Sequence, residues 1–252
     1  MQLHIREHNS HITVVTIDNE PRRNAMSRAM LADLAALWNR LDTAPACRCV
    51  VLTGAGTKAF CAGADISGDL TASLEMARTI NRGLLKTSTF SKPIIAAVNG
   101  VCAGGGVELL LSTDIRATVA DARFGLPEVR WAIYPFGGAT VKLTQQIGYV
   151  HAMDLLLTGR MIEASDALRL GLVNEIVARD QLMPWALAKA EAIAANSPAA
   201  VQAVKQQISA TIADFTGSRE ALEQQLGDRV RASADFAEGI AAFRAKRPGK
   251  YD

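Results

Sequence analysis

The sequence lacks the features that mark membrane, secreted and nucleic-acid-binding proteins. Among its 252 residues, no apolar run approaches the ~20 residues that a transmembrane helix needs. The net charge of +2 is too small to indicate a nucleic-acid or membrane-surface partner. The N-terminus, MQLHIREHNSH, is polar and charged and shows no signal-peptide pattern. We therefore expect a cytoplasmic protein with no membrane or nucleic-acid partner.

Cysteine and histidine are scarce, and their spacing favours neither a disulfide framework nor a metal site. The four cysteines follow neither a disulfide nor a zinc pattern: they are Cys47, Cys49, Cys61 and Cys102. The histidines have no carboxylate pattern around them: they are His4, His8, His11 and His151. We expect no metal. The hydrophobic share of 49% is enough for one large domain, or one domain with an appendage.

The most informative stretch is a short apolar run followed by three glycines. Residues 93–98 contain β-branched residues and end at Asn99-Gly100, which predicts a buried strand and a turn. Residues 104–106 are all glycine, and Glu108 follows at the start of an apolar segment that predicts a buried helix. Without side chains, unpaired backbone N–H groups at a helix start can approach an anion or a developing oxyanion closely.

A second interpretation of the glycines remains open at this point. They could permit a close crossing of helix and strand, with Glu108 serving only as a capping acid. The residues of this stretch alone do not decide between the two.

The remaining pattern alternates strands and helices without a sequence repeat. A hairpin is expected over 3–7 and 12–18, with Ser27 capping a helix over 28–42. Further strands are expected over 49–53 and 114–119, and residues 54–69 form a long loop. Helices are expected over 71–87, 137–147, 152–157 and 165–170, a strand over 174–177, and a loop or short strand over 123–128.

The tail of the chain is rich in alanine and helical in pattern. Four helices are expected, over 181–195, 199–213, 219–233 and 235–246, with breaks at 196–198 and at Thr216-Gly217. They have too few large apolar residues to form a core alone, so we expect them to pack on the body or on another subunit. We place the core at residues 1–195 and a helical region at 196–252, used for oligomerisation and pocket closure.

Several spaced motifs together resemble the crotonase superfamily, the enoyl-CoA hydratases and isomerases, over essentially the whole chain. The motifs are Pro21-Arg22-Arg23-Asn24-Ala25, Ala59 to Ile66 (AFCAGADI), Ile95 to Gly100 followed by Gly104 to Glu108 (GGGVE), Phe124 to Glu128 (FGLPE), and Leu157-Thr158-Gly159 followed by Gly171-Leu172-Val173. Each motif is weak alone, and their order makes the resemblance specific.

The resemblance implies an α/β fold, a crotonase-like spiral of ββα units with a helical C-terminal region, assembled as trimers or as hexamers made of paired trimers. It implies an acyl-CoA thioester substrate and no external cofactor, because CoA arrives with the substrate. The backbone amides of Ala62 and Gly105 would form the oxyanion hole. Glu108 and Glu128, 20 residues apart, fall on the two acid/base positions. Substrate and CoA contacts would come from Arg23, Ala25, Ala64, Asp65, Ile66, Trp131 and Phe136.

The chain departs from the hydratase pattern after Glu128. Residues 135–140 read Pro-Phe-Gly-Gly-Ala-Thr, so Phe136 replaces a glycine that faces the water in the family. Arg130-Trp131 replaces a usually aliphatic pair, and Ala132 a usual glycine. We expect these changes to reshape the acyl pocket or disturb the water site.

The function predicted from the sequence is the hydration of a 2-trans-enoyl-CoA to a 3-hydroxyacyl-CoA, with Glu108 as the base and Glu128 as the acid. One alternative is 3,2-enoyl-CoA isomerisation, or hydrolysis or retro-Claisen cleavage of a specialised acyl-CoA. Another is a non-catalytic acyl-CoA-binding or RNA-associated member. An isomerase needs only one acid, so the presence of both glutamates favours hydration.

Overall fold

The computed structural model describes residues 2–65 and 74–251, and within these ranges strand–strand–helix units follow one another along the chain. The order confirms the predicted ββα pattern. The first two units are β1 (Gln2–Asn9), β2 (Ile12–Asp18), α1 (Arg28–Thr43), then β3 (Cys49–Gly54), β4 (Ala59–Cys61), α2 (Leu74–Gly83). The next two are β5 (Ile94–Val98), β6 (Val101–Ala103), α3 (Gly105–Leu110), then β7 (Ile115–Val119), β8 (Arg123–Gly125), α4 (Ala139–Ile147).

The strands of the later units separate into two sheets. In the described residues, the larger sheet has the order β1-β2-β3-β5-β7-β10 and the smaller one β4-β6-β8-β9. The added strands are β9 (Met161–Glu163) and β10 (Glu175–Val177). In the larger sheet β2, β3, β5, β7 and β10 pair in parallel, and β1 closes the edge antiparallel to β2. Each new unit therefore adds its first strand to one sheet and its second strand to the other.

The centre of the larger sheet is buried on both faces, which explains its continuous apolar runs. Every residue of β3 and of β5 is buried. The helix α7 (Leu182–Ala194) packs across β3, β5 and β7 on one side. Ser27 caps α1 by accepting the Met30 amide at 3.2 Å, as predicted.

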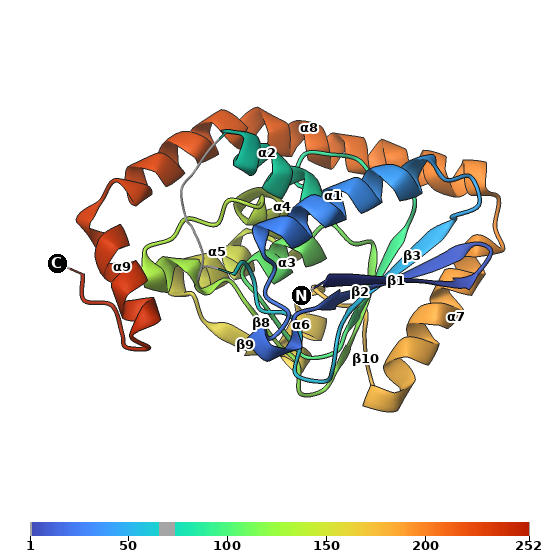
Figure 1. Cartoon of the computed structure of the whole chain (residues 1–252), viewed down its shortest axis with the longest axis horizontal. Coiled ribbons are helices and arrows are strands. Elements are labelled where there is room, and N and C mark those ends of the chain that lie inside the picture. Colours follow the sequence, from blue (N-terminus) through green and yellow to red (C-terminus); the bar gives the residue numbers. More distant parts are fainter. Residues whose placement is uncertain (1, 66–73, 252) are drawn as a thin grey trace.

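The C-terminal region corrects one prediction. A single helix, α8 (Pro198–Arg231), runs through Thr216-Gly217, where a break was expected. Glycine costs only about 1 kcal/mol in a helix interior, and buried Thr216 bonds back to the Ile212 carbonyl at 2.7 Å. In Figure 1, α8 runs along one side of the molecule, where it contacts α2 and α4, and α9 (Ala234–Arg244) turns away at its end.

The other short elements complete the chain. They are α5 (Tyr149–Thr158), α6 (Ala164–Arg169) and the short 3-10 helices η1 (Glu20–Arg22), η2 (Pro127–Trp131) and η3 (Arg179–Gln181). The sequence analysis missed β4, β6 and β9, each three residues long, because three residues are too few to show an alternating pattern. In residues 2–65 and 74–251, no helix combines the length and apolar character needed to span a membrane.

Candidate active site

The glycine turn joins β6 to α3 and brings two loops together. Gly104 adopts φ 54° and ψ −127°, a conformation that favours glycine, and its amide donates to the Gly125 carbonyl at 3.0 Å. A side chain at Gly106 would overlap the Cys61 carbonyl, so this glycine permits the close crossing of α3 over β4. The structure therefore confirms the packing interpretation for Gly106, and it leaves Gly105 for separate consideration.

Two unpaired amides lie beside each other at the start of α3. A Cβ built on Gly105 would lie 3.5 Å from the Ala64 nitrogen, and one built on Gly63 would lie 3.4 Å from the Gly105 nitrogen. Within the described ranges, neither the Ala64 nor the Gly105 amide donates a hydrogen bond. The loop is held in place because Met26 pairs with it on both sides, donating to Gly63 and accepting from Asp65, each at 2.8 Å. Two fixed donors of this kind can bind an anionic oxygen.

The prediction that Ala62 supplies one of these donors is wrong. The Ala62 amide donates to the Arg23 carbonyl at 3.0 Å and is therefore already engaged. Gly63 adopts φ 106°, and the next amide in the loop, that of Ala64, is the unpaired one that lies near Gly105. Ala64, which the sequence analysis placed only among the substrate and CoA contacts, takes the position that was assigned to Ala62.

Glu108 projects from the first turn of α3 into a buried space. Its residue is 6% exposed, and its Oε1 accepts the Gly137 amide at 2.5 Å. A side chain at Gly137 would overlap the Glu108 carboxyl, so only glycine allows this approach. Burial raises the pKa of Glu108 to about 7, against the lowering influence of the Gly137 amide, Lys86 and Lys142.

Glu128 lies in η2 and reaches the same space from the other side. Its Oε1 lies 3.0 Å from the position that a Cβ on Gly104 would occupy. Its Oε2 is buried and has no hydrogen-bond partner among the residues that the structure describes. Burial, and next to it the negative charge of Glu108, raise the pKa of Glu128 to about 8.

The two carboxyl groups thus meet at the start of α3, as the motif spacing predicted, but their surroundings differ. Glu108 has an amide donor and two nearby lysines that stabilise its charged form. Glu128 has an unpartnered oxygen and a negative neighbour that favour its protonated form. Burial raises the pKa of both carboxyls, and that of Glu128 is the higher, so Glu128 holds its proton more readily than Glu108 does.

Behind Glu108 lies a buried charged cluster that the sequence analysis missed. Lys86 is 3% exposed and forms an ion pair with Glu223 of α8, which is 5% exposed. Lys142 is also buried and donates to the Leu85 carbonyl at 2.7 Å and to Ser112 Oγ at 2.8 Å. Burial lowers the pKa of Lys142 to about 8. These residues come from three separate segments, so nothing in the local sequence distinguishes them from solvated charges.

The other residues predicted to contact CoA lie in two loops, residues 21–25 and 62–65. Arg22 forms an ion pair with Asp65 at 2.9 Å, and this ties the 62–65 loop to η1. Arg23 is exposed with φ 53°, and Ala25 is half-buried. Contacts of Arg23, Ala25, Ala64 and Asp65 with CoA stay predictions. Ile66 lies outside the described residues.

The two aromatic residues predicted to contact substrate pack against the C-terminal helices. Trp131 meets Phe243 of α9 edge-on, with 5.3 Å between ring centroids. Phe136 lies 5.4 Å from the Tyr134 ring, and a side chain on Gly227 of α8 would overlap it. The Phe136 ring thus finds its space against α8. Contacts of either residue with substrate stay predictions.

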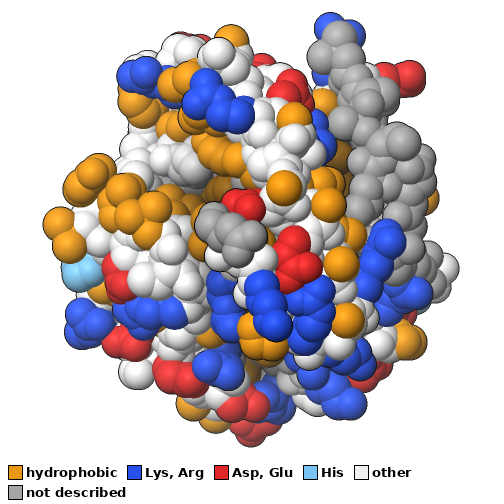
Figure 2. Space-filling view, turned by 90° about the vertical axis from the view of Figure 1, so that its left-hand side faces the viewer, with side chains coloured by type: hydrophobic (Ala, Val, Ile, Leu, Met, Phe, Trp, Pro, Cys, Tyr) orange, Lys and Arg blue, Asp and Glu red, His pale blue; other side chains and the backbone are white. Residues whose placement is uncertain are grey.

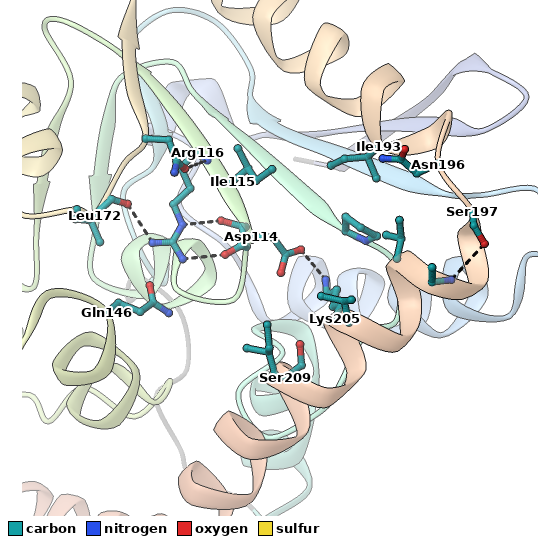
Figure 3. A pocket seen from close by; sticks show the side chains of 18 residues that line it. Asp114, Ile115, Arg116, Gln146, Leu172, Ile193, Asn196, Ser197, Lys205 and Ser209 are labelled. Carbon is teal, nitrogen blue, oxygen red and sulfur yellow. Dashed lines mark hydrogen bonds and ion pairs between the residues drawn. The ribbon is translucent and has the colours of Figure 1, made fainter.

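Two large cavities lie near the C-terminal helices. A cavity of about 580 Å³ opens beside η2, lined largely by apolar residues of the segment 129–135, of α5 and of the end of α8. On the same side of the molecule, Figure 2 shows hydrophobic side chains gathered around a hollow. A second cavity, of about 880 Å³, lies between β7 and α8, and Figure 3 shows Lys205 pointing across it to Asp114. Neither Glu108 nor Glu128 lines these two cavities.

Comparisons with known proteins cover nearly the whole chain. The family described as enoyl-CoA hydratase/isomerase matches residues 7–252. The enoyl-CoA hydratase EchA19 of Mycobacterium tuberculosis is 40% identical over 252 residues, covering 97% of this chain and 94% of that protein. A mevalonyl-coenzyme A hydratase of Aspergillus fumigatus is 38% identical over 248 residues, covering 96% and 91%. The crystal structure of a carnitinyl-CoA hydratase from Mycobacterium avium superposes with a TM-score of 0.91 at 33% identity, covering 99% of this chain and 98% of that one.

Proposed function

The chain belongs to the enoyl-CoA hydratase/isomerase family, and from this premise we propose that it adds water to a 2-trans-enoyl-CoA to give a 3-hydroxyacyl-CoA. The observation that carries the proposal is the contrast between the two buried carboxyl groups. Glu108 accepts the Gly137 amide and has two lysines nearby, whereas Glu128 has a buried oxygen without a partner in the described residues and a negative neighbour, so Glu128 holds its proton more readily. Hydration needs one base and one acid, on either side of one double bond.

The unpaired amides of Ala64 and Gly105 would hold the thioester oxygen. When water adds to C3, negative charge moves to that oxygen as an enolate. A fixed amide donor at such an oxygen is worth roughly 3 kcal/mol of transition-state stabilisation. The closeness of the two nitrogens, and the absence of other acceptors for them in the described ranges, supports this role.

The two glutamates would complete the proton balance. Glu108 takes a proton from the attacking water as the new C–O bond forms at C3. Glu128 delivers its proton to C2 as the enolate collapses. The pair ends with the proton on Glu108 rather than on Glu128. Transfer of this proton from Glu108 to Glu128 after the product leaves restores the starting state.

Loss of absorbance at the enoyl thioester band, with crotonyl-CoA and longer or branched thioesters, tests the proposal. Hydration should appear for at least one member of the panel. Migration of a 3,4 double bond without water addition would instead favour the isomerase, and tight acyl-CoA binding without turnover would favour a non-catalytic protein. The relatives are named for different acyl groups, so the panel needs polar and branched chains as well as straight ones.

The Gly105→Ala variant tests the amide pair. Its new methyl group would lie 3.5 Å from the Ala64 nitrogen, in van der Waals contact with it. The methyl group would therefore occupy space next to the two amide donors. We expect about a hundredfold loss of kcat with a normal Tm, because the oxygen can no longer reach both amides. An unchanged kcat would remove the amides from the mechanism.

From the same family membership, we also propose that the protein assembles as a trimer or as a pair of trimers, located in the cytoplasm. Large apolar side chains that stay exposed on α5 and α8 support assembly: Tyr149, Val150, Leu157, Val204 and Ile208. Light scattering after size-exclusion chromatography tests this, and a stable monomer at micromolar concentration would contradict it.

A further inference from the structure

The buried face of α8 meets the turn that supplies the amide on Glu108. In this 34-residue helix, the buried residues are Thr216, Glu223 and Gly227, which recur at helical spacing on one side. Each lies beside residues 136–138 or the lysines next to them. The buried contacts of α8 are therefore concentrated on one short turn of the body.

Gly227 receives the Phe136 ring. A Cβ on Gly227 would overlap that ring, so only glycine allows the ring to dock there. The Arg231 guanidinium, one helical turn further along, lies 4.6 Å from the ring centroid on the same face. Phe136 immediately precedes Gly137, whose amide donates to Glu108. The docked ring thus fixes the residue next to the donor.

Glu223 holds the other side of the turn. It forms the buried ion pair with Lys86, and Lys86 Cγ lies 3.1 Å from the position that a Cβ on Gly138 would take. Thr216 Cγ2 lies 3.5 Å from the same position. The turn is therefore packed from α8 at Phe136 and at Gly138, directly before and after the donating amide.

The helix itself has further anchors outside its contacts with this turn. Lys205, near its N-terminal end, donates to the Lys92 carbonyl at 2.6 Å and to the Asp114 carboxylate at 2.7 Å. Asn81 of α2 donates to Glu220 at 2.6 Å. These contacts give α8 a defined position against the body on both sides of Thr216.

We propose that Glu223 and Gly227 are positioning residues: through the 136–138 turn they hold the Gly137 amide on Glu108 and set the charge around that base. This inference rests on the proposed function, in which Glu108 accepts the proton from water. The charged groups that face Glu108 are Glu128 of η2, Glu223 of α8, Lys86 after α2 and Lys142 of α4. Glu223 is the one among them that comes from α8.

The steric half of the proposal is tested with a matched pair of glycines on the same helix. Gly227→Ala should push the Phe136 ring and lower kcat by about tenfold to a hundredfold with little change in KM. Gly217→Ala, whose new methyl group would meet nothing within 4 Å, should leave kcat unchanged. The double variant Gly227→Ala, Phe136→Ala removes the overlap and should recover activity relative to Gly227→Ala alone. Equal kcat for the two single variants would overturn the steric half.

The electrostatic half is tested by the pH profile. Glu223→Gln leaves Lys86 uncompensated near Glu108, so the acid limb of kcat should move to lower pH by about half a unit or more. Lys86→Met removes a cation and should move the limb the other way. A variant that merely loosens the structure lowers kcat at every pH without moving the limb. An unmoved limb in Glu223→Gln would overturn this half.

A readout without substrate separates this inference from the proposed function. In protein labelled with ¹³C at the glutamate carboxyls, the Glu108 signal is the one lost in Glu108→Gln. Its titration midpoint should fall in Glu223→Gln, whether or not any thioester in the panel is hydrated. If the wild type is inactive while this midpoint still moves, the proposed function fails and the positioning role stands.

Discussion

Glu108 and Glu128 are the same residue type in the same buried space, yet their hydrogen-bond partners and neighbouring charges differ. Glu108 stands on a regular helix and accepts an amide hydrogen bond, with Lys86 and Lys142 behind it. Glu128 stands in a single 3-10 turn with one buried oxygen unpartnered, and the nearest charge is negative. The comparison teaches that the division of labour between two acids is set by their neighbours, and those neighbours come from distant parts of the chain.

The largest effect is expected from removing either carboxyl. Glu108→Gln and Glu128→Gln should each lower kcat by about a thousandfold, since a positioned acid or base typically contributes two to four orders of magnitude. Initial rates of thioester hydration measure this. Deuterium exchange at C2 should persist in Glu108→Gln and be lost in Glu128→Gln. This result would distinguish the role of Glu128, which protonates C2, from that of Glu108. Rates equal to wild type in both variants would remove the mechanism.

The second effect comes from breaking the contact that distinguishes Glu108. Gly137→Ala places a methyl group where the Glu108 carboxyl lies, so the carboxyl must move off the amide. We expect about a hundredfold loss of kcat, because a misplaced base no longer reaches the water. Steady-state kinetics beside the Gly217→Ala control measures it. A normal kcat would show that the amide does not hold the base in its working position.

A third prediction follows from the two pKa values. The rate should rise as the pH passes about 7, where Glu108 loses its proton, and fall above about 8, where Glu128 loses the proton that it must deliver. Each limb should change the rate by up to about tenfold per pH unit. A profile of kcat between pH 5 and 10 checks the order of the limbs. A rate that keeps rising above pH 9 would contradict a protonated Glu128.

The smallest effect concerns stability. The folded-state pKa of Glu128, about 8, lies above its ordinary value of 4.5, so the folded state favours the protonated form. Below pH 4.5 this carboxyl is protonated in both states, and Glu128→Gln should leave Tm nearly unchanged. As pH rises towards 8, the wild type loses stability that the variant keeps, so the variant should become more stable by a few degrees. Thermal unfolding at pH 4.5, 6 and 8 measures the difference, and a constant difference would contradict the raised pKa.

Most of the helices and strands were predicted correctly from the sequence, because the patterns that indicate them involve only neighbouring residues. The hairpin, the Ser27 cap, the buried strands predicted over 49–53 and 93–98 and the helix predicted after the three glycines all depend on a few adjacent residues. The spacing of Glu108 and Glu128 also predicted that their carboxyl groups lie close together, and the structure places both at the start of α3. The three-residue strands were not predicted, because they are defined by hydrogen bonds to a partner strand rather than by an alternating hydrophobic pattern in their own sequence.

The errors have a different origin. Ala62 and Ala64 are identical in type and two residues apart, and only the positive φ of Gly63 and the Arg23 carbonyl decide which amide is free. The Thr216-Gly217 break was expected from local propensity, whereas the buried face of α8 keeps the helix continuous. Nothing near Phe136 in the sequence indicated that its ring packs against Gly227, 91 residues later in the chain, and its effect on the acyl pocket or the water site stays a prediction.

The sequence by itself determined the ββα order, the glycine turn and the spacing of Glu108 and Glu128, because backbone propensity, hydrophobic runs and spaced motifs are properties of neighbouring residues. Only the tertiary structure decided which amides stay unpaired and which carboxyl holds its proton more readily. Those outcomes depend on burial and on charges such as Lys86, Lys142 and Glu223, which folding alone brings to one place. Electrostatic energies depend on the distance between charges in space, and the number of residues between two charges in the sequence does not determine that distance.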